Sequence, residues 1–228
     1  MEKYLKKLRP SMLKFLRARY DEDEVKKRWK KIEELDAEWL RKEGDLGGRR
    51  NMMSSNMMLC YAMCAFYEAV DRNYTNEDFL VLVNEVMAKP FAPLNHIDMN
   101  KLEKKKWLMN FLYYCMKRYQ HKSDRMRGKR WGNTWKIRIN PDNRETGFAY
   151  VLDTCPLYEF AKKYGYMDFL PNMCALDHLV AGQFHAHLIR HHTLSGGDGK
   201  CEYWYVGDRS LEAAEDKLKQ GEDASGRL

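Results

Sequence analysis

The sequence of 228 residues has no apolar run long enough to span a membrane. A spanning helix needs roughly 18 to 20 uninterrupted apolar residues, whereas the most apolar stretch, residues 52–70, is interrupted at residues 54–56 and at Glu68. The first ten residues, MEKYLKKLRP, also lack the apolar core and small-residue cleavage site of a signal peptide. We therefore expect a soluble cytoplasmic protein with no membrane partner.

The chain also lacks the features of a disulfide framework or a zinc site, although it contains six cysteines. Without an export signal, reduced thiols are the default, and no Cys-x-x-Cys spacing occurs. The cysteines at positions 60, 64 and 115 lie in apolar helical stretches, which favours core packing. Cys155, Cys174 and Cys201 instead lie near Pro, Asp, His and Gly residues. We predict no metal or other cofactor, and a zinc ion held by these three cysteines and a histidine is the alternative.

No basic field covers the whole chain, despite a net charge of +7. Residues 101–140 hold 13 basic and 2 acidic side chains, a net charge of +11, whereas residues 141–228 hold 9 and 14, a net charge of −5. The basic stretch has Trp107, Trp131 and Trp135 interleaved, which is compatible with stacking on bases. A solvated helix face is the more frequent explanation of such a run. A nucleic-acid or acidic partner is therefore the alternative to a small-molecule substrate, and the oligomeric state is not predicted.

Amphipathic and apolar helices dominate the first half of the sequence. Apolar residues recur at helical spacing in residues 5–16 and 25–40, and the Gly47–Gly48 pair then breaks the pattern. Further helices are predicted over residues 54–71, from a cap at Thr75 or Asn76 to residue 88, and over residues 99–121.

The second half changes to the period of β-strands. Residues 134–153 predict a hairpin, and FHAHLIRHHT and CEYWYV predict two more strands joined by a glycine-rich loop. Short helices are expected over residues 156–164 and 171–181, each with Pro at its start. The fold class is therefore α+β, with a helical amino-terminal layer on a small antiparallel sheet. We expect a single domain, 1–228, with a mostly helical part at 1–125, the sheet and two short helices at 130–206, and a polar tail at 209–228.

A turn after the predicted hairpin places a cysteine next to a helix start. Cys155 precedes Pro156, and backbone amides at a helix start favour a thiolate over a thiol. Asp153, two residues earlier, points to the same side if the extended path continues, so the pair suits a nucleophile and its base or orienting group. A buried turn thiol is the alternative.

Two further clusters carry side chains suited to catalysis. Cys174, Asp177 and His178 stand at i, i+3 and i+4, so they share one helix face. In the His-rich strand, alternation places His185 with the other odd-numbered positions and Arg190 on the opposite face. A half-buried helix face and an exposed strand face are the structural alternatives.

The motifs of this region resemble the L-2-amino-thiazoline-4-carboxylic acid hydrolase family. They occur in the order GGRRN, LDTCPLYEF, LPNMCALD and RHHTLSGGDGKCEYWY, covering about residues 47–205. One departure is Thr154 directly before Cys155, where family members often carry Glu.

The resemblance implies a hydrolase that opens the ring of a small cyclic amidine. It implies Cys155 as nucleophile with Asp153 as base or orienting group, and Asp177 as the partner of the amidine nitrogens. Arg190 is expected to hold the substrate carboxylate, and His185 is a candidate proton carrier. Further substrate-binding candidates are Asn51, Cys174, His178, Thr193, Gly196, Gly197 and Cys201.

The aromatic residues near these motifs suggest a second substrate class. Phe184, Tyr203, Trp204 and Tyr205 are large enough to line a pocket for a bulkier ring than a thiazoline. Packing within the sheet core is the alternative, because aromatic residues are enriched in strands of any function.

Overall fold

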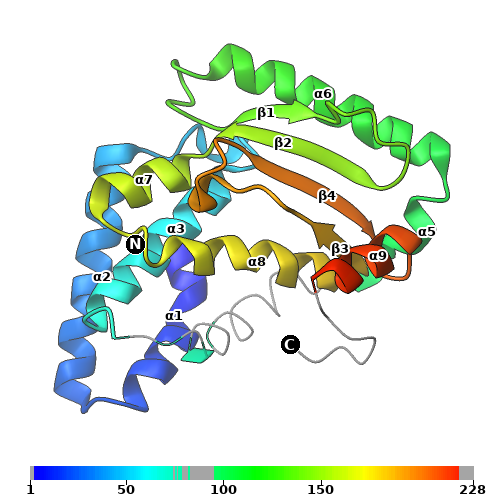
Figure 1. The fold of residues 1–228 in the computed structure, drawn as a ribbon. Helices are drawn as coiled ribbons and strands as arrows, with labels where there is room; N and C mark the ends of the chain where they lie inside the picture. The colour runs from blue at the N-terminus through cyan, green and yellow to red at the C-terminus, as the bar shows by residue number, and fades with distance from the viewer. Residues whose placement is uncertain (1–2, 74, 76, 79–81, 83–94, 221–228) are drawn as a thin grey trace. The chain divides into compact units, whose positions relative to one another are not determined.

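The structure is a computed structural model that describes residues 3–73, 75, 77–78, 82 and 95–220 (Figure 1). The chain forms two compact units, each assembled from three segments. Unit 1 comprises Met1–Pro90, Met126–Thr134 and Pro156–Met173, and unit 2 comprises Phe91–Arg125, Trp135–Cys155 and Cys174–Leu228. The single domain stays a prediction. No helix in the described part of the chain is long and apolar enough to cross a membrane.

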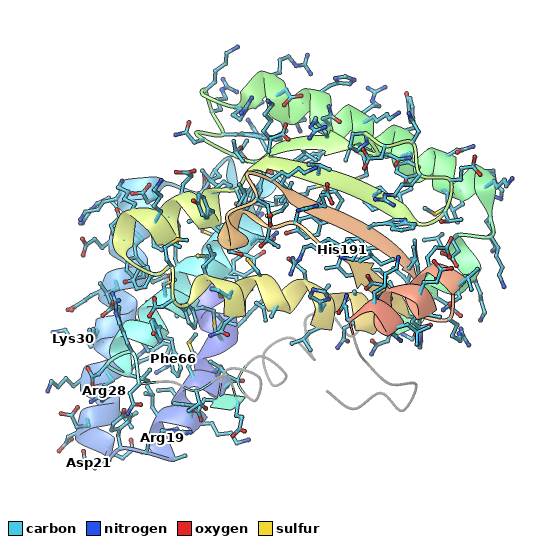
Figure 2. The ribbon with its side chains drawn as sticks, in the orientation of Figure 1. Arg19, Asp21, Arg28, Lys30, Phe66 and His191 are labelled. Atoms are coloured by element: carbon cyan, nitrogen blue, oxygen red, sulfur yellow. The ribbon has the colours of Figure 1, made fainter. Side chains whose placement is uncertain are left out.

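Unit 1 is helical, and its first two helices bury the predicted apolar stripes. Helix α1 (Lys3–Arg17) buries Leu5, Leu8 and Met12, and α2 (Glu22–Glu43) buries Trp29 and Ile32. Asp21 begins α2, because its carboxylate accepts hydrogen bonds from two amides of the first turn. Arg28 of α2, which is labelled in Figure 2, donates to the Asp71 carboxylate at 2.8 Å.

Helix α3 (Ser54–Ala69) is buried on nearly every side, as its Met-rich sequence predicts. A 3₁₀ turn, η1 (Gly48–Arg50), precedes it. Gly47 has φ of +100°, and a Cβ there would lie 2.2 Å from Cδ1 of the buried Trp131. Glycine is therefore required at this turn by both backbone angle and space.

Aromatic rings join α7 (Pro156–Tyr164) to the rest of unit 1. Phe160 packs against Trp39 and Tyr61 with ring centroids 5.3 and 5.1 Å apart. Tyr67 stacks on Phe169 at 4.5 Å. Such pairs contribute roughly 0.5 to 1.5 kcal/mol each beyond their area burial.

Unit 2 contains a four-stranded antiparallel sheet in the order β1-β2-β4-β3. Its strands are β1 (Lys136–Ile139), β2 (Phe148–Thr154), β3 (Ala186–Ile189) and β4 (Cys201–Gly207). The predicted hairpins and the α+β class are thereby confirmed. Gly147 directly precedes β2 and has φ of +68°. A Cβ at this position would lie 2.3 Å from the Tyr205 carbonyl oxygen.

The described residues of unit 2 also form four helices and a 3₁₀ turn. They are α5 (Met99–Leu102), α6 (Lys106–Met126), α8 (Leu170–Gln183, in unit 2 from Cys174 onward), η3 (Leu194–Gly196) and α9 (Leu211–Lys219). Helix α6 lies along the edge of β1, where Gln120 accepts a hydrogen bond from the Ile139 amide at 2.9 Å (Figure 1). Its Tyr113 hydroxyl donates to Gly147 and accepts from the Ala149 amide, both at 3.0 Å.

Three predicted elements differ in the structure, and one is not described. The helix expected over residues 99–121 is divided between Leu102 and Lys106, and the side chain of Glu103 in the break accepts a hydrogen bond from the Gly207 amide. The His-rich strand is only four residues long, since His185 has φ of +53°. Within the polar tail expected at 209–228, the structure forms a helix, α9, which Ser210 caps and which buries Asp216. The helix expected at 75–88 lies mostly outside the described residues.

Candidate active site

The sheet of unit 2 has two faces with different chemistry. Alternation along β2 places Tyr150 on one face and Asp153 on the other. The register continues the first face through Tyr203 of β4, which lies opposite Tyr150. We name the faces the Asp177 face, because Asp177 of α8 contacts Tyr203, and the Asp153 face.

Asp177 on α8 is held from two strands at once. Arg190, directly after β3, donates from Nη1 to Asp177 Oδ2 at 2.8 Å and from Nη2 to the Cys174 carbonyl at 2.8 Å. The Tyr203 hydroxyl donates to the same Oδ2 at 3.2 Å. Among the described residues no hydrogen bond reaches Oδ1, so that oxygen is available to a ligand. These four residues, Cys174, Asp177, Arg190 and Tyr203, form what we call the Asp177 cluster.

The Asp177 carboxylate is desolvated and still open to solvent. Burial raises its pKa above the ordinary value, while Arg190 and Tyr203 oppose the increase. The side chain nevertheless keeps 36% of its surface exposed, whereas that of Arg190 keeps 6%. Surrounding protein therefore crowds the carboxylate without covering it. Such a position suits pairing with a planar cation.

Three stacked tyrosine rings lie on the Asp177 face of the sheet, and one of them, Tyr203, belongs to the Asp177 cluster. The rings of Tyr150 and Tyr203 stack at 4.6 Å with an interplanar angle of 9°, and Tyr205 follows with centroids 6.3 Å from both. Burial raises the pKa of all three phenols. Each hydroxyl therefore stays protonated at neutral pH and acts as a hydrogen-bond donor.

Two thiols of the region are protonated as well. Burial is the main cause that raises the pKa of Cys174 to about 11. Its sulfur lies 3.8 Å from the Ser195 hydroxyl of η3. Burial also raises the pKa of Cys201, whose sulfur accepts a hydrogen bond from the Leu194 amide at 3.2 Å. Neither environment favours a thiolate.

Cys155 is the single residue between β2 and α7, and it is half-buried. After burial and Asp177, the Cys201 and Cys155 thiols also contribute to the raised pKa of Tyr203. The register pairs Leu152 of β2 with Cys201 of β4, so Cys155 follows that pair by three residues along the chain. Its role as nucleophile stays a prediction.

Asp153 forms an ion pair with two basic residues of β1. Arg138 of β1 donates to both of its carboxylate oxygens, with its shortest bond 2.8 Å long, and Lys136 lies 3.5 Å away. The hydrogen bond from Arg138 lowers the pKa of Asp153. The extended path ends with β2 at Thr154, so the alternation that was expected to align Asp153 with Cys155 stops between them.

The predicted carboxylate-binding groups are used within the protein. Arg190 pairs with Asp177 and is not directed to a ligand. Thr193 Oγ1 accepts from the Gly196 amide at 3.0 Å and the Gly197 amide donates to the Leu194 carbonyl at 3.1 Å. These amides stabilise the loop that carries Ser195 next to Cys174, and their expected contact with substrate stays a prediction.

The remaining predicted residues are distributed over other places. Asn51 is buried in unit 1, where Nδ2 donates to the Leu46 carbonyl and to Thr134 Oγ1. His185 is exposed and lies 3.5 Å from Asp208. His178 is exposed on α8, yet burial of its ring, with Arg190 and His187, lowers its pKa to about 4. It is therefore neutral above that pH.

Asp216 was not among the predicted site residues, and it anchors the His-rich strand. Asp216 is 3% exposed and accepts a hydrogen bond from Gln220 at 2.7 Å. Its Oδ2 lies 2.8 Å from His187 Nε2, and its Oδ1 lies 3.4 Å from Nε2 of His191, which is labelled in Figure 2. No group of three or more His, Cys, Asp or Glu side chains in the described ranges is arranged to hold a metal ion.

A family comparison identifies the same region. The model of the L-2-amino-thiazoline-4-carboxylic acid hydrolase family matches residues 52–205, which contain every member of the Asp177 cluster. No curated protein and no solved structure matches this chain. Family membership supports a hydrolase-type function. The protein belongs to the L-2-amino-thiazoline-4-carboxylic acid hydrolase family.

Proposed function

We propose that the protein hydrolyses a small cyclic amidine of the thiazoline type and that Asp177 anchors the amidine. The observation that carries this proposal is the arrangement of Asp177: Arg190 and Tyr203 fix one oxygen, and the other receives no hydrogen bond from the described residues. A protonated amidine can donate one N–H to this free oxygen as a charge-assisted hydrogen bond, and desolvation strengthens the pairing.

Arg190 then acts as a positioning residue. Its guanidinium neutralises part of the Asp177 charge and fixes the carboxylate plane, and its second nitrogen ties β3 to the Cys174 carbonyl. Tyr203 adds a donor to the same oxygen and a ring below the guanidinium, 5.2 Å from it. These contacts leave the amidine as the remaining partner for Oδ1.

Cys155 is the proposed nucleophile. Its sulfur adds to the amidine carbon, the ring C–S bond breaks, and the proton from the Cys155 thiol ends on the departing ring sulfur. Water then adds to the same carbon and releases Cys155 as a thiol, so the sum consumes one water and yields an open-chain carbamoylated thiol. The same site opens the ring at the C–N bond if the amine departs instead, and the product distinguishes the two.

Ring opening at the C–S bond releases a thiol, which a thiol-specific reagent detects directly. With 2-amino-thiazoline-4-carboxylate, Asp177→Asn is expected to lower kcat/KM by roughly 100-fold, because a neutral amide cannot pair with the cation. The matched control is Asp153→Asn on the opposite face of the sheet, which should keep wild-type kinetics. Equal loss in both variants, or none in Asp177→Asn, contradicts the anchoring role.

The nucleophile is tested by Cys155→Ala beside Cys115→Ala, an exposed cysteine of α6. Turnover should vanish in the first variant with an unchanged melting temperature, and it should persist in the second. Retained turnover in Cys155→Ala would leave water as the attacking group and remove the covalent step. A substrate with a larger ring, compared in the same assay, tests whether the tyrosine stack accepts a bulkier group.

A further inference from the structure

Helix α6 presents aromatic residues to solvent at helical spacing. Trp107, Phe111 and Tyr114 keep 71%, 59% and 55% of their surfaces exposed. The spacing i, i+4, i+7 aligns them in one stripe along the helix, and Arg118 and Arg125 extend the same stripe toward the carboxyl end. We call these five residues the α6 stripe.

The opposite side of α6 is already used by the sheet. Gln120, Tyr113 and Ser123 hydrogen-bond to β1, β2 and the residues beside them. The stripe therefore does not form the core of unit 2. A contiguous exposed aromatic stripe is uncommon on a soluble protein and marks an interaction surface.

Lysines flank the stripe on both sides and precede it in sequence. Lys104, Lys105 and Lys106 lie at the start of α6, and Lys117 and Lys122 lie beside its second half; all are exposed. Of the two acidic residues among positions 101–140, Glu103 is directed to the Gly207 amide and only Asp124 lies on α6. A second copy of this surface would be repelled, so the partner carries negative charge.

We propose that the α6 stripe docks the protein on an anionic lipid surface, with α6 lying parallel to the bilayer. A helix of 21 residues presents a straight edge about 32 Å long, which suits a flat partner. Trp and Tyr prefer the level of the lipid headgroups, and lysine stems extend their charges toward anionic headgroups.

A nucleic acid fits the same surface less well. Trp131 and Trp135, two of the three tryptophans that suggested base stacking, are 2% exposed and belong to the core. Arg118 donates from Nη1 to the Tyr114 hydroxyl at 2.9 Å. This nitrogen is therefore not free for bidentate hydrogen bonding to a phosphate. The remaining cations of α6 are mostly lysines, which act as point charges in front of a lipid surface.

Vesicle co-sedimentation of the whole protein tests the proposal. Binding is expected to vesicles of phosphatidylcholine mixed with phosphatidylserine, and to fall by about tenfold or more with phosphatidylcholine alone or on raising the salt concentration. The double variant Trp107→Ala/Phe111→Ala should lose binding by a similar factor while keeping ring-opening activity.

The matched control is Leu211→Ala/Leu218→Ala, which removes two apolar side chains of α9 that are 72% and 71% exposed. This control should bind like the parent protein. Equal loss in both double variants, or no binding to the mixed vesicles, overturns the proposal. Salt-dependent binding to single-stranded or duplex DNA without vesicle binding, or a dimer that Trp107→Ala/Phe111→Ala converts to monomer, also overturns it and assigns the stripe to nucleic acid or to a second copy.

Discussion

Two Arg–Asp pairs lie on opposite faces of the same sheet and behave in opposite ways. Arg190 pairs with Asp177 at 2.8 Å and Arg138 pairs with Asp153 at 2.8 Å, so the two contacts are alike in length. The arginine side chains are 6% and 44% exposed, respectively. Correspondingly, the pKa of Asp177 is raised, mainly by burial, and that of Asp153 is lowered, mainly by its hydrogen bond from Arg138.

The difference shows that environment decides what an ion pair does. On the Asp153 face, the guanidinium of Arg138 is open to water, and such a pair contributes little to stability. On the Asp177 face, the guanidinium of Arg190 is almost fully buried beside a partly exposed carboxylate, and the desolvation cost of this pair can be offset by a cationic ligand. A pair of that second kind is a feature expected of a binding site.

The largest expected effect comes from Arg190→Met, which leaves Asp177 without its buried cation. We expect a loss of about 3 kcal/mol in the free energy of unfolding, together with loss of turnover. Denaturant titration measures the first and the thiol-release assay the second. In Arg190→Met/Asp177→Leu the stability should recover while activity stays absent; recovery of activity would show that the pair is structural only.

Tyr203→Phe is expected to have a smaller effect. The variant removes the hydroxyl that donates to Asp177 Oδ2 and keeps the stacked ring, so about 1 kcal/mol of stability is lost. Steady-state kinetics should show a lower kcat/KM, since the carboxylate is less well oriented. The control Tyr113→Phe removes a buried hydroxyl at the edge of β2, and it should lower stability without lowering kcat/KM.

His178, on the same helix as Asp177, makes the stability of the protein depend on pH. Its pKa is lowered from 6.5 to about 4, so between these values the unfolded chain binds a proton that the folded protein does not. Stability from this group is therefore complete above pH 6.5 and falls as the pH decreases toward 4. His178→Gln should flatten that part of the curve of melting temperature against pH. Because the residue is exposed, the slope is expected to be shallow, and an unchanged curve would contradict the lowered pKa.

The smallest expected effect belongs to Arg138→Ala on the Asp153 face of the sheet. An exposed pair contributes about 0 to 1 kcal/mol. Because the folded pKa of Asp153 is lowered, this contribution is present above the ordinary pKa of an aspartate and disappears as the pH falls below it. Urea titrations at neutral and acidic pH should show a small difference from the parent at neutral pH and none in acid. A neutral-pH loss as large as that of Arg190→Met would contradict the distinction between the faces.

Local rules in the sequence predicted the elements well and their pairings less well. Period-2 alternation, turn residues and helix-starting prolines predicted both hairpins, and α7 begins and ends where expected. Asp177 and Arg190 were each identified as site candidates, but their pairing depends on how β3 approaches α8, and no local pattern encodes that distance. The glycine amides at 196 and 197 were expected to serve a ligand because a glycine-rich loop looks the same whether its amides point inward or outward. Asp216 was missed because an acidic residue in a charged tail resembles a solvated one until α9 packs.

The alternation of the two units along the chain has a practical consequence for dividing the protein. Six segments alternate between unit 1 and unit 2, so the chain passes from one to the other five times. Two of these passages fall directly after Cys155 and directly before Cys174. A truncation at any single point therefore leaves at least one unit incomplete, and an end before residue 174 removes β3, β4 and Arg190 together. Neither unit can be obtained as one continuous fragment. Experiments on either unit therefore require the whole protein.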